Sequence, residues 1–294
     1  MSNMRCFSSA MVIVVGMALV FLAPVSAAGQ IPPAAAKAWD PPRTPDGQPD
    51  IQGVWRHNHR YGVWTANDLE TGDDHGESET RGQPEVSPGT VSAVIDPPDG
   101  RIPYQPWAAA KRQQIQSHFL GPLSLRGLRP STLCLNSVPR LSYHMEFQVV
   151  QTRESVVMLW EWSHAYRVIP LNGRPHVEQN VKLSMGDARG HWEGNTLVVN
   201  TTNLNDWDWF DLNGATIHSD AMSLVERFTF VDADTIQYQF TVADPKVFTR
   251  SWTVAIPLTL DRTHGSAEGY ELMEHACVEG ERGVENLLGK DPRK

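Results

Sequence analysis

Apolar and polar residues alternate along most of the chain after residue 140. Alternation with a period of two places every second side chain on the same face of a β-strand. These runs are rich in aromatic and β-branched residues, which favour strands. The pattern predicts strands over residues 51–55, 143–151, 155–162, 164–171, 197–204, 222–230, 235–243 and 247–260, with 270–277 as a further candidate.

Short turn signals separate several of these runs: Glu193-Gly194-Asn195, Asp232-Ala233-Asp234 and Asp244-Pro245. Pro106 begins a stretch that is typical of one helix of about three turns. The strands predicted after residue 140 number seven, or eight with 270–277, and joined in this way they predict a mostly β fold, an antiparallel meander β-barrel that is calycin-like in general shape. We expect residues 51–294 to form this barrel as one domain.

The first 50 residues follow a different pattern. Residues 10–23 are apolar but too few to span a membrane, which takes about 20 residues. Small residues follow Pro24, so residues 1–27 are interpreted as a secretory signal peptide, and we expect a periplasmic or secreted protein without a membrane anchor. The proline-rich residues 28–50 predict an extended arm. The many acidic residues within 67–100 predict a mobile, solvated loop.

Composition narrows the expected partner to a small molecule. The formal net charge of −9 opposes binding to nucleic acid or anionic lipid, which requires clustered positive charge. Ten tryptophans indicate a protein that binds something flat and apolar. The sequence has no phosphate loop, dinucleotide fingerprint, nucleophile elbow or HExxH motif, so we expect no cofactor. His57 and His59 have a metal-like spacing, but two ligands without a third predict no metal site.

One stretch combines aromatic and titratable side chains more densely than the rest. It supplies three candidate catalytic residues, Glu161, His164 and Tyr166, and three candidate binding residues, Trp160, Trp162 and Arg167. On one continuous strand the two tryptophans, His164 and Tyr166 share a face, unless the break at Ser163 exchanges the faces. Aromatic rings beside an imidazole and a phenol suit a phenolic ligand. The alternative is a barrel core in which His164 bonds to a backbone carbonyl.

A second group of candidates lies in three other segments. Trp207 and Trp209 belong to a stretch with the composition of a loop that covers a ligand. This stretch leads to His218, a candidate base oriented by Asp220, which alternatively forms an Asx-type turn. His144 is a further candidate for substrate binding.

Glu226 and Arg227 are neighbours on one predicted strand, so they fall on opposite faces and one of them points inward. An inward charge is costly unless it is paired, and such costs are frequent at functional sites. Glu226 is therefore a candidate catalytic residue. Arg167 or Arg227 is a candidate clamp for a substrate carboxylate, and the alternative is a buried ion pair.

Several motifs extend over nearly the whole chain that follows the signal peptide. They are TPDGQPD at 44–50 with GVW at 53–55, RVIPLNGRPH at 167–176, MGDARGHWEG at 185–194, VERFT at 225–229, DADTI at 232–236 and ACVEG at 276–280. In these motifs the chain resembles a large group of exported, mostly uncharacterised bacterial proteins. Some members of that group look like cofactor-free lyases of lignin-derived aromatics, including ring opening with decarboxylation of phenylcoumaran acids.

The leading hypothesis is an exported, cofactor-free lyase that acts on a small phenolic substrate by acid–base elimination. His164 or His218 takes the phenolic proton, a benzylic ether oxygen departs, and Tyr166 or a carboxylic acid protonates that oxygen. One alternative is a periplasmic, lipocalin-like binding protein for apolar small molecules. Another is a glycan-active enzyme that uses paired carboxylates such as Glu146 and Glu161.

After signal cleavage the chain keeps two cysteines, Cys134 and Cys277. Two cysteines in an oxidising compartment usually pair, so we predict a disulfide between them, with two separate buried thiols as the alternative. Thiol titration of the unfolded, unreduced protein should find almost no free sulfhydryl. Two free thiols per chain would contradict the prediction.

Overall fold

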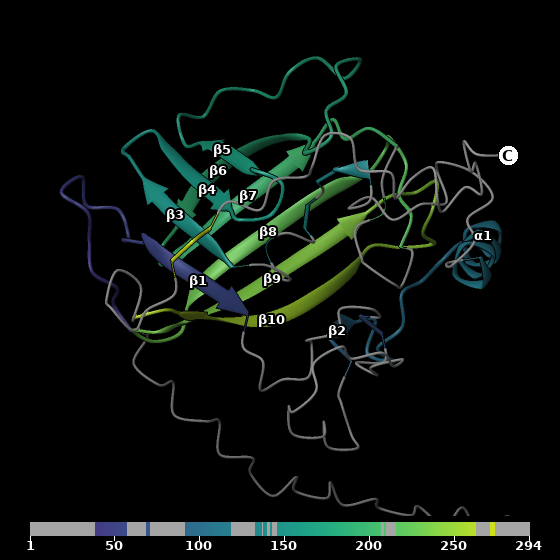
Figure 1. Ribbon diagram of the computed structural model, residues 1–294, viewed down its shortest axis with the longest axis horizontal. Helices are drawn as coiled ribbons and strands as arrows, with labels where there is room; N and C mark the ends of the chain where they lie inside the picture. Colours follow the sequence, from purple (N-terminus) through teal and green to yellow (C-terminus); the bar gives the residue numbers. More distant parts are fainter. Residues whose placement is uncertain are drawn as a thin grey trace, which may run out of the picture. The chain divides into compact units, whose positions relative to one another are not determined.

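A single antiparallel path of nine strands wraps into a nearly closed barrel (Figure 1). The computed structural model describes residues 39–57, 69–70, 92–118, 133–136, 138–139, 142, 146–206, 209, 216–262 and 271–273. The strands follow one another in the order β5-β4-β3-β1-β10-β9-β8-β7-β6, and β2 pairs with β10 outside this path. The predicted mostly β barrel with one helix is confirmed.

The elements have the following bounds: β1 Gly53–His57, β2 Val94–Asp96, α1 Pro106–Ser117, β3 Phe147–Gln151, β4 Ser155–Trp160, β5 Tyr166–Pro170, β6 Asp187–Glu193, β7 Thr196–Thr202, β8 Ser223–Phe230, β9 Thr235–Ala243 and β10 Trp252–Leu260. Strict alternation of buried and less buried residues marks β8 and β9, as the sequence pattern predicts. Pro106 stands at the start of α1, where a missing N–H costs nothing. Within the described residues no helix is long and apolar enough to cross a membrane.

The structure differs from the sequence analysis at β6 and in the acidic stretch 67–100. β6 was not predicted, because two of the three alternate non-charged positions in its sequence DARGHWE hold the small residues Ala188 and Gly190, which give only a weak apolar signal. The acidic stretch 67–100 is not a solvated loop throughout: it contains β2, and Leu69 is buried. Glu70 accepts hydrogen bonds from Arg112 of α1 (2.9 Å) and from the backbone N–H of Ile102 (2.6 Å), so this acid is part of the fold.

The described part of the predicted arm, residues 39–50, turns back on itself instead of running extended. Thr44 N–H donates to the Gln48 carbonyl (2.9 Å), and Gly47 takes a positive φ of 80° that favours glycine. Before this turn, the Trp39 ring packs against Phe230, with centroids 5.8 Å apart. The arm is therefore fixed to the barrel by an aromatic contact.

Many of the strand ends lie at one end of the barrel, because of the directions in which the strands run. Because neighbours in the path are antiparallel, the end of one strand lies beside the start of the next. The end of β1 and the start of β3 lie at the same end as the β4–β5 hairpin. The ends of β7 and β9 and the starts of β8 and β10 lie there as well. We call this the β4–β5 end.

Large aromatic side chains fill the interior of the barrel. Those that are buried to 2% exposure or less include Trp55, Phe147, Phe228, Tyr238, Phe240 and Trp252. Phe228 and Tyr238 stack with their ring centroids 4.7 Å apart, and contacts continue from Tyr238 through Phe240 to Trp252. Burying each such side chain stabilises the fold by about 2–3 kcal/mol.

The path ends at β5 and β6, which face each other across a seam. Eight antiparallel steps separate the two strands, so they run in the same direction. A Cβ at Gly190 of β6 would lie 2.7 Å from Ile169 Cγ2 and 2.9 Å from Leu171 Cδ2. The absence of a side chain at Gly190 therefore lets β5 and its following residue pack closely against β6.

Gly190→Ala should destabilise the protein by about 1–3 kcal/mol, because the added methyl group overpacks the seam. Urea unfolding of Gly190→Ala, Ile169→Ala and the double variant provides the measurement. In the double variant the vacated space accommodates the methyl group, so the cost of the alanine should shrink. Fully additive costs would show that the seam does not depend on this contact.

Candidate functional site

The β4–β5 hairpin exchanges the faces of the most promising stretch. Trp160 N–H donates to the Ala165 carbonyl (2.9 Å), and Ser163 and His164 between them both have a φ of 51°. Two consecutive non-glycine residues in the left-handed region are unusual and carry strain. Trp160 consequently faces inward with 4% exposure, whereas Tyr166 is 66% exposed on the outer face. Trp160 and Tyr166 therefore do not share one face: the break at Ser163 exchanges the faces, which is the exception that the sequence prediction allowed for.

A pocket of about 340 Å³ lies beside this hairpin. It is lined by Gln148, Leu159, Trp160, Glu161, His164, Leu272 and Met273. The pocket brings together three of the predicted site residues, Trp160, Glu161 and His164. An imidazole and a carboxylate thus border one space together with residue Trp160, and such groups can transfer protons to and from a bound ligand.

Arg167 and Glu226 lie inside the barrel, not at the pocket. Arg167 Nη2 is 2.6 Å from Glu226 Oε2, and the two side chains are 3% and 0% exposed. Arg167 also donates to the Thr201 hydroxyl, and the Tyr238 hydroxyl donates to Glu226 Oε1 (2.9 Å). Burial, reinforced by the charge of Glu226, holds the pKa of Tyr238 well above its usual range. Of the two predicted roles for Arg167, the buried ion pair describes its observed contacts.

Arg227 points outward, as its position next to an inward glutamate requires. Its Nη2 donates to Glu193 Oε2 (2.9 Å), and both side chains are largely exposed. Tyr166 is likewise on the outer surface, where it pairs across strands with Leu159. Arg227 therefore lies away from both the pocket and the barrel interior.

His218 and Trp209 are buried near the chain that leads into β8. Burial lowers the pKa of His218, and its Nδ1 lies 3.2 Å from the Ser219 carbonyl oxygen. Asp220 does not orient this ring as hypothesised: its Oδ1 accepts a hydrogen bond from Lys246 Nζ (2.6 Å). Trp209 is 2% exposed and packs against Ile115 of α1, so it is a core side chain.

The remaining predicted residues are placed only in part. Trp162 is partly buried and packs against the main core. Several predicted residues lie outside the described ones: His144, Trp207, His59, Cys277 and the side chain of His57. Because Cys277 is among them, its disulfide to Cys134 stays a prediction. Among the residues that the structure describes, no group of three His, Cys, Asp or Glu side chains forms a metal-binding cluster.

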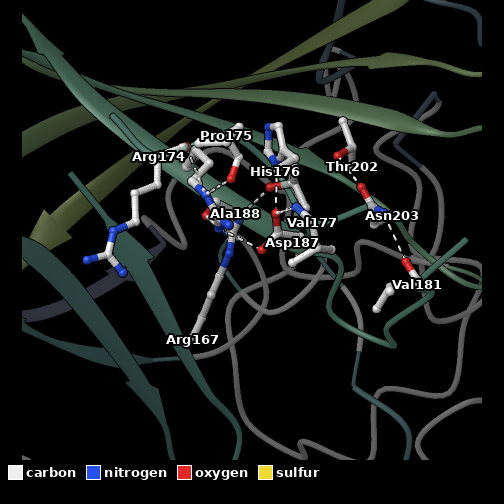
Figure 2. A network of polar contacts seen from close by, with 12 residues as sticks. Arg167, Arg174, Pro175, His176, Val177, Val181, Asp187, Ala188, Thr202 and Asn203 are labelled. Carbon is white, nitrogen blue, oxygen red and sulfur yellow. Dashed lines mark hydrogen bonds and ion pairs between the residues drawn. The ribbon is translucent and has the colours of Figure 1, made fainter. Parts of the chain in front are cut away.

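Sequence reasoning missed a polar network around Asp187 at the start of β6 (Figure 2). Asp187 Oδ2 accepts hydrogen bonds from His176 Nδ1 (2.9 Å) and from the backbone N–H of Val177 (3.1 Å). Arg189 Nη1 donates to Oδ1 (2.6 Å). Burial alone raises the pKa of Asp187, but these hydrogen bonds outweigh it and leave the pKa below its usual value. The only sequence signal was that His176 and Asp187 each belong to a quoted motif.

Comparisons with known proteins find no relative. No family model, curated protein or solved structure matches the chain. The function is therefore inferred from the chemistry of the site.

Glu226→Ala should lower the free energy of unfolding by about 3–5 kcal/mol, because it leaves the Arg167 charge buried without its partner. Replacing both charges, as in Arg167→Met with Glu226→Leu, should recover most of this loss. Urea unfolding measures both effects. Glu193→Ala, which breaks the exposed pair with Arg227, is the matched control and should change stability little. An equally small effect of Glu226→Ala would contradict the assignment of a buried ion pair.

Proposed function

We propose that the protein is an exported, cofactor-free lyase that acts on a small phenolic substrate in the pocket at the β4–β5 hairpin. The observation that carries the proposal is that Trp160, Glu161 and His164 border the same pocket. The strained left-handed backbone at His164 adds support, since such strain is concentrated at functional sites. The resemblance of the quoted motifs to an exported group that includes lyases points in the same direction.

In the proposed reaction His164 takes the proton of the substrate phenol. The electron pair that is released moves through the ring and breaks the benzylic C–O bond, which gives a quinone methide. Glu161 in its acid form protonates the departing oxygen. Loss of a neighbouring proton, or of CO₂ from a substrate carboxylate, then restores the aromatic ring. Every electron pair stays within the substrate, so the step requires no oxidant or reductant.

The filled interior argues against a lipocalin-like mode of binding. In a lipocalin-type barrel the ligand lies inside, and the interior must hold a cavity for it. Here Phe228, Tyr238 and Phe240 occupy that position and pack against one another. Ligand binding at the outer pocket, with titratable groups on its wall, favours an enzyme over a carrier.

Export and the disulfide between Cys134 and Cys277 belong to the same proposal. A periplasmic or secreted location supplies the oxidising conditions in which such a bond persists. Cofactor independence is consistent with that location, because the reaction uses only side chains and the substrate.

His164→Asn is the sharpest test, because asparagine tolerates the left-handed backbone at this position. It should lower kcat on a phenolic dimer by about 10²–10⁴-fold, the usual contribution of a general base. Glu161→Gln should also lower kcat. Thermal stability should change little in His164→Asn, since this side chain is exposed. Product analysis with a panel of phenolic dimers provides the measurement.

His118→Gln, which alters an exposed histidine immediately after α1, is the matched control and should leave turnover unchanged. Methylating the substrate phenol should abolish turnover, because no phenolate can form. Undiminished turnover of the methyl ether would overturn the mechanism. Stoichiometric binding without any product would instead identify a binding protein.

A further inference from the structure

The network around Asp187 has the geometry of a proton-accepting dyad. Asp187 is 9% exposed, and its two oxygens accept hydrogen bonds from three different donors. A carboxylate held by several donors, one of them the Arg189 guanidinium, is stabilised in its ionised form. The side chain next to His176 is therefore an acceptor that carries no proton of its own.

This arrangement fixes the tautomer of His176. An ionised carboxylate can only accept hydrogen bonds, so Nδ1, which lies 2.9 Å from Asp187 Oδ2, must carry the proton of the neutral ring. The lone pair of the ring is then on Nε2, on the side that faces away from Asp187 (Figure 2). When Nε2 accepts a proton, the resulting imidazolium is stabilised by the adjacent negative charge.

The connection from β5 to β6 that carries His176 is anchored on both sides of it. Arg189 Nε donates to the carbonyl oxygens of Arg174 (3.2 Å) and Pro175 (3.1 Å), immediately before His176. After it, Asn203 Nδ2 donates to the carbonyl oxygens of Glu178 (2.8 Å) and Val181 (2.9 Å). A surface connection is thereby held in one conformation, as a group that must meet a ligand in a defined geometry requires.

A second histidine–carboxylate pair on the same strand provides a contrast. His191 Nε2 lies 3.0 Å from Glu193 Oε1, but these side chains are 51% and 48% exposed. In the pair His176–Asp187 the corresponding values are 29% and 11%, so the carboxylate is shielded while the ring stays accessible. Shielding strengthens the electrostatic coupling within the dyad, and access allows a ligand to reach Nε2.

We infer that His176 and Asp187 form a second proton-accepting site, separate from the hairpin pocket, which binds a phenolic hydroxyl group through His176 Nε2. A neutral imidazole takes up a proton most completely from a hydroxyl whose acidity is near its own, and among common ligands a phenol with an electron-withdrawing substituent has that acidity. The phenol proton moves to Nε2, and an imidazolium–phenolate pair results. No other bond forms or breaks.

The test uses 4-nitrophenol, whose phenolate has its own visible absorption band. At a pH below the pKa of the free probe, added wild-type protein should increase the phenolate band in a saturable way. His176→Gln should weaken binding by about tenfold or more, as expected for loss of a charge-assisted hydrogen bond. Asp187→Asn should weaken it in the same direction, because the amide no longer stabilises the imidazolium. His191→Gln is the matched control and should bind the probe like the wild type.

Two results would overturn the inference. The first is an unchanged phenolate band in His176→Gln, with the band lost instead in His164→Asn, which would assign the probe to the hairpin pocket. The second does not depend on any variant folding correctly: nitrogen-15 NMR of the wild type should find the His176 proton on Nδ1, and a proton on Nε2 would refute the dyad. Because the readout is binding and tautomer, failure of the proposed lyase activity would leave this test unaffected.

Discussion

The ion pair between Arg167 and Glu226 connects strands from the two ends of the strand path, across the seam between β5 and β6. Arg167 belongs to β5, at one end of the path, whereas Thr201 and Glu226 belong to β7 and β8, on the other side of the seam. An odd number of strands cannot close with an antiparallel pair, so β5 and β6 meet in the same direction. Side-chain packing at Gly190 and this buried charge pair supply the cohesion that a regular ladder gives elsewhere. The side chains of Arg167 and Glu226 are almost fully shielded from water. Removing one of them would therefore leave the other charge buried without a partner, at a large cost in stability.

The same seam explains the long connection at residues 171–186. Two strands that run in the same direction cannot be joined by a tight hairpin, because the chain must return along the barrel before the second strand begins. The connection therefore crosses from one end to the other, and the hydrogen bonds of Asp187, Arg189 and Asn203 fix it along its course. His176 owes its defined position to these anchors. A candidate chemical site thus arises where the topology demands an irregular segment, which is where sites commonly occur.

Sequence patterning predicted the β-strands well wherever one face is buried and the other is solvated. For β9 the predicted and observed bounds agree, since every second residue from Ile236 to Val242 is apolar or aromatic and points inward. β6 escaped prediction because Ala188 and Gly190, at two of its three alternate non-charged positions, are too small to give a clear apolar signal. The sequence located the possible exchange of faces at Ser163, but the exchange itself depends on two left-handed residues, a conformation that is rare without glycine and that the sequence does not predict. Alternation predicted that Glu226 and Arg227 face opposite ways, but only the structure shows that Glu226 points inward and which partners the two side chains meet.

The filled interior of the barrel determines which of the predicted site residues are packed in the core and which are accessible to a ligand. Trp160 and Arg167, which the sequence suggested for ligand contact, both point into a core whose space is taken by aromatic rings. Because the interior is filled, a ligand meets titratable side chains outside the core, and at the β4–β5 end His164 and Glu161 border a pocket. The hairpin there leaves His164 exposed and keeps Trp160 packed behind it, so the rigid wall of the barrel positions a small group of reactive side chains. The buried face of these two strands carries the ion pair and the core contacts, whereas the hairpin tip carries the side chains of the proposed site, so a change at the tip should leave the seam undisturbed.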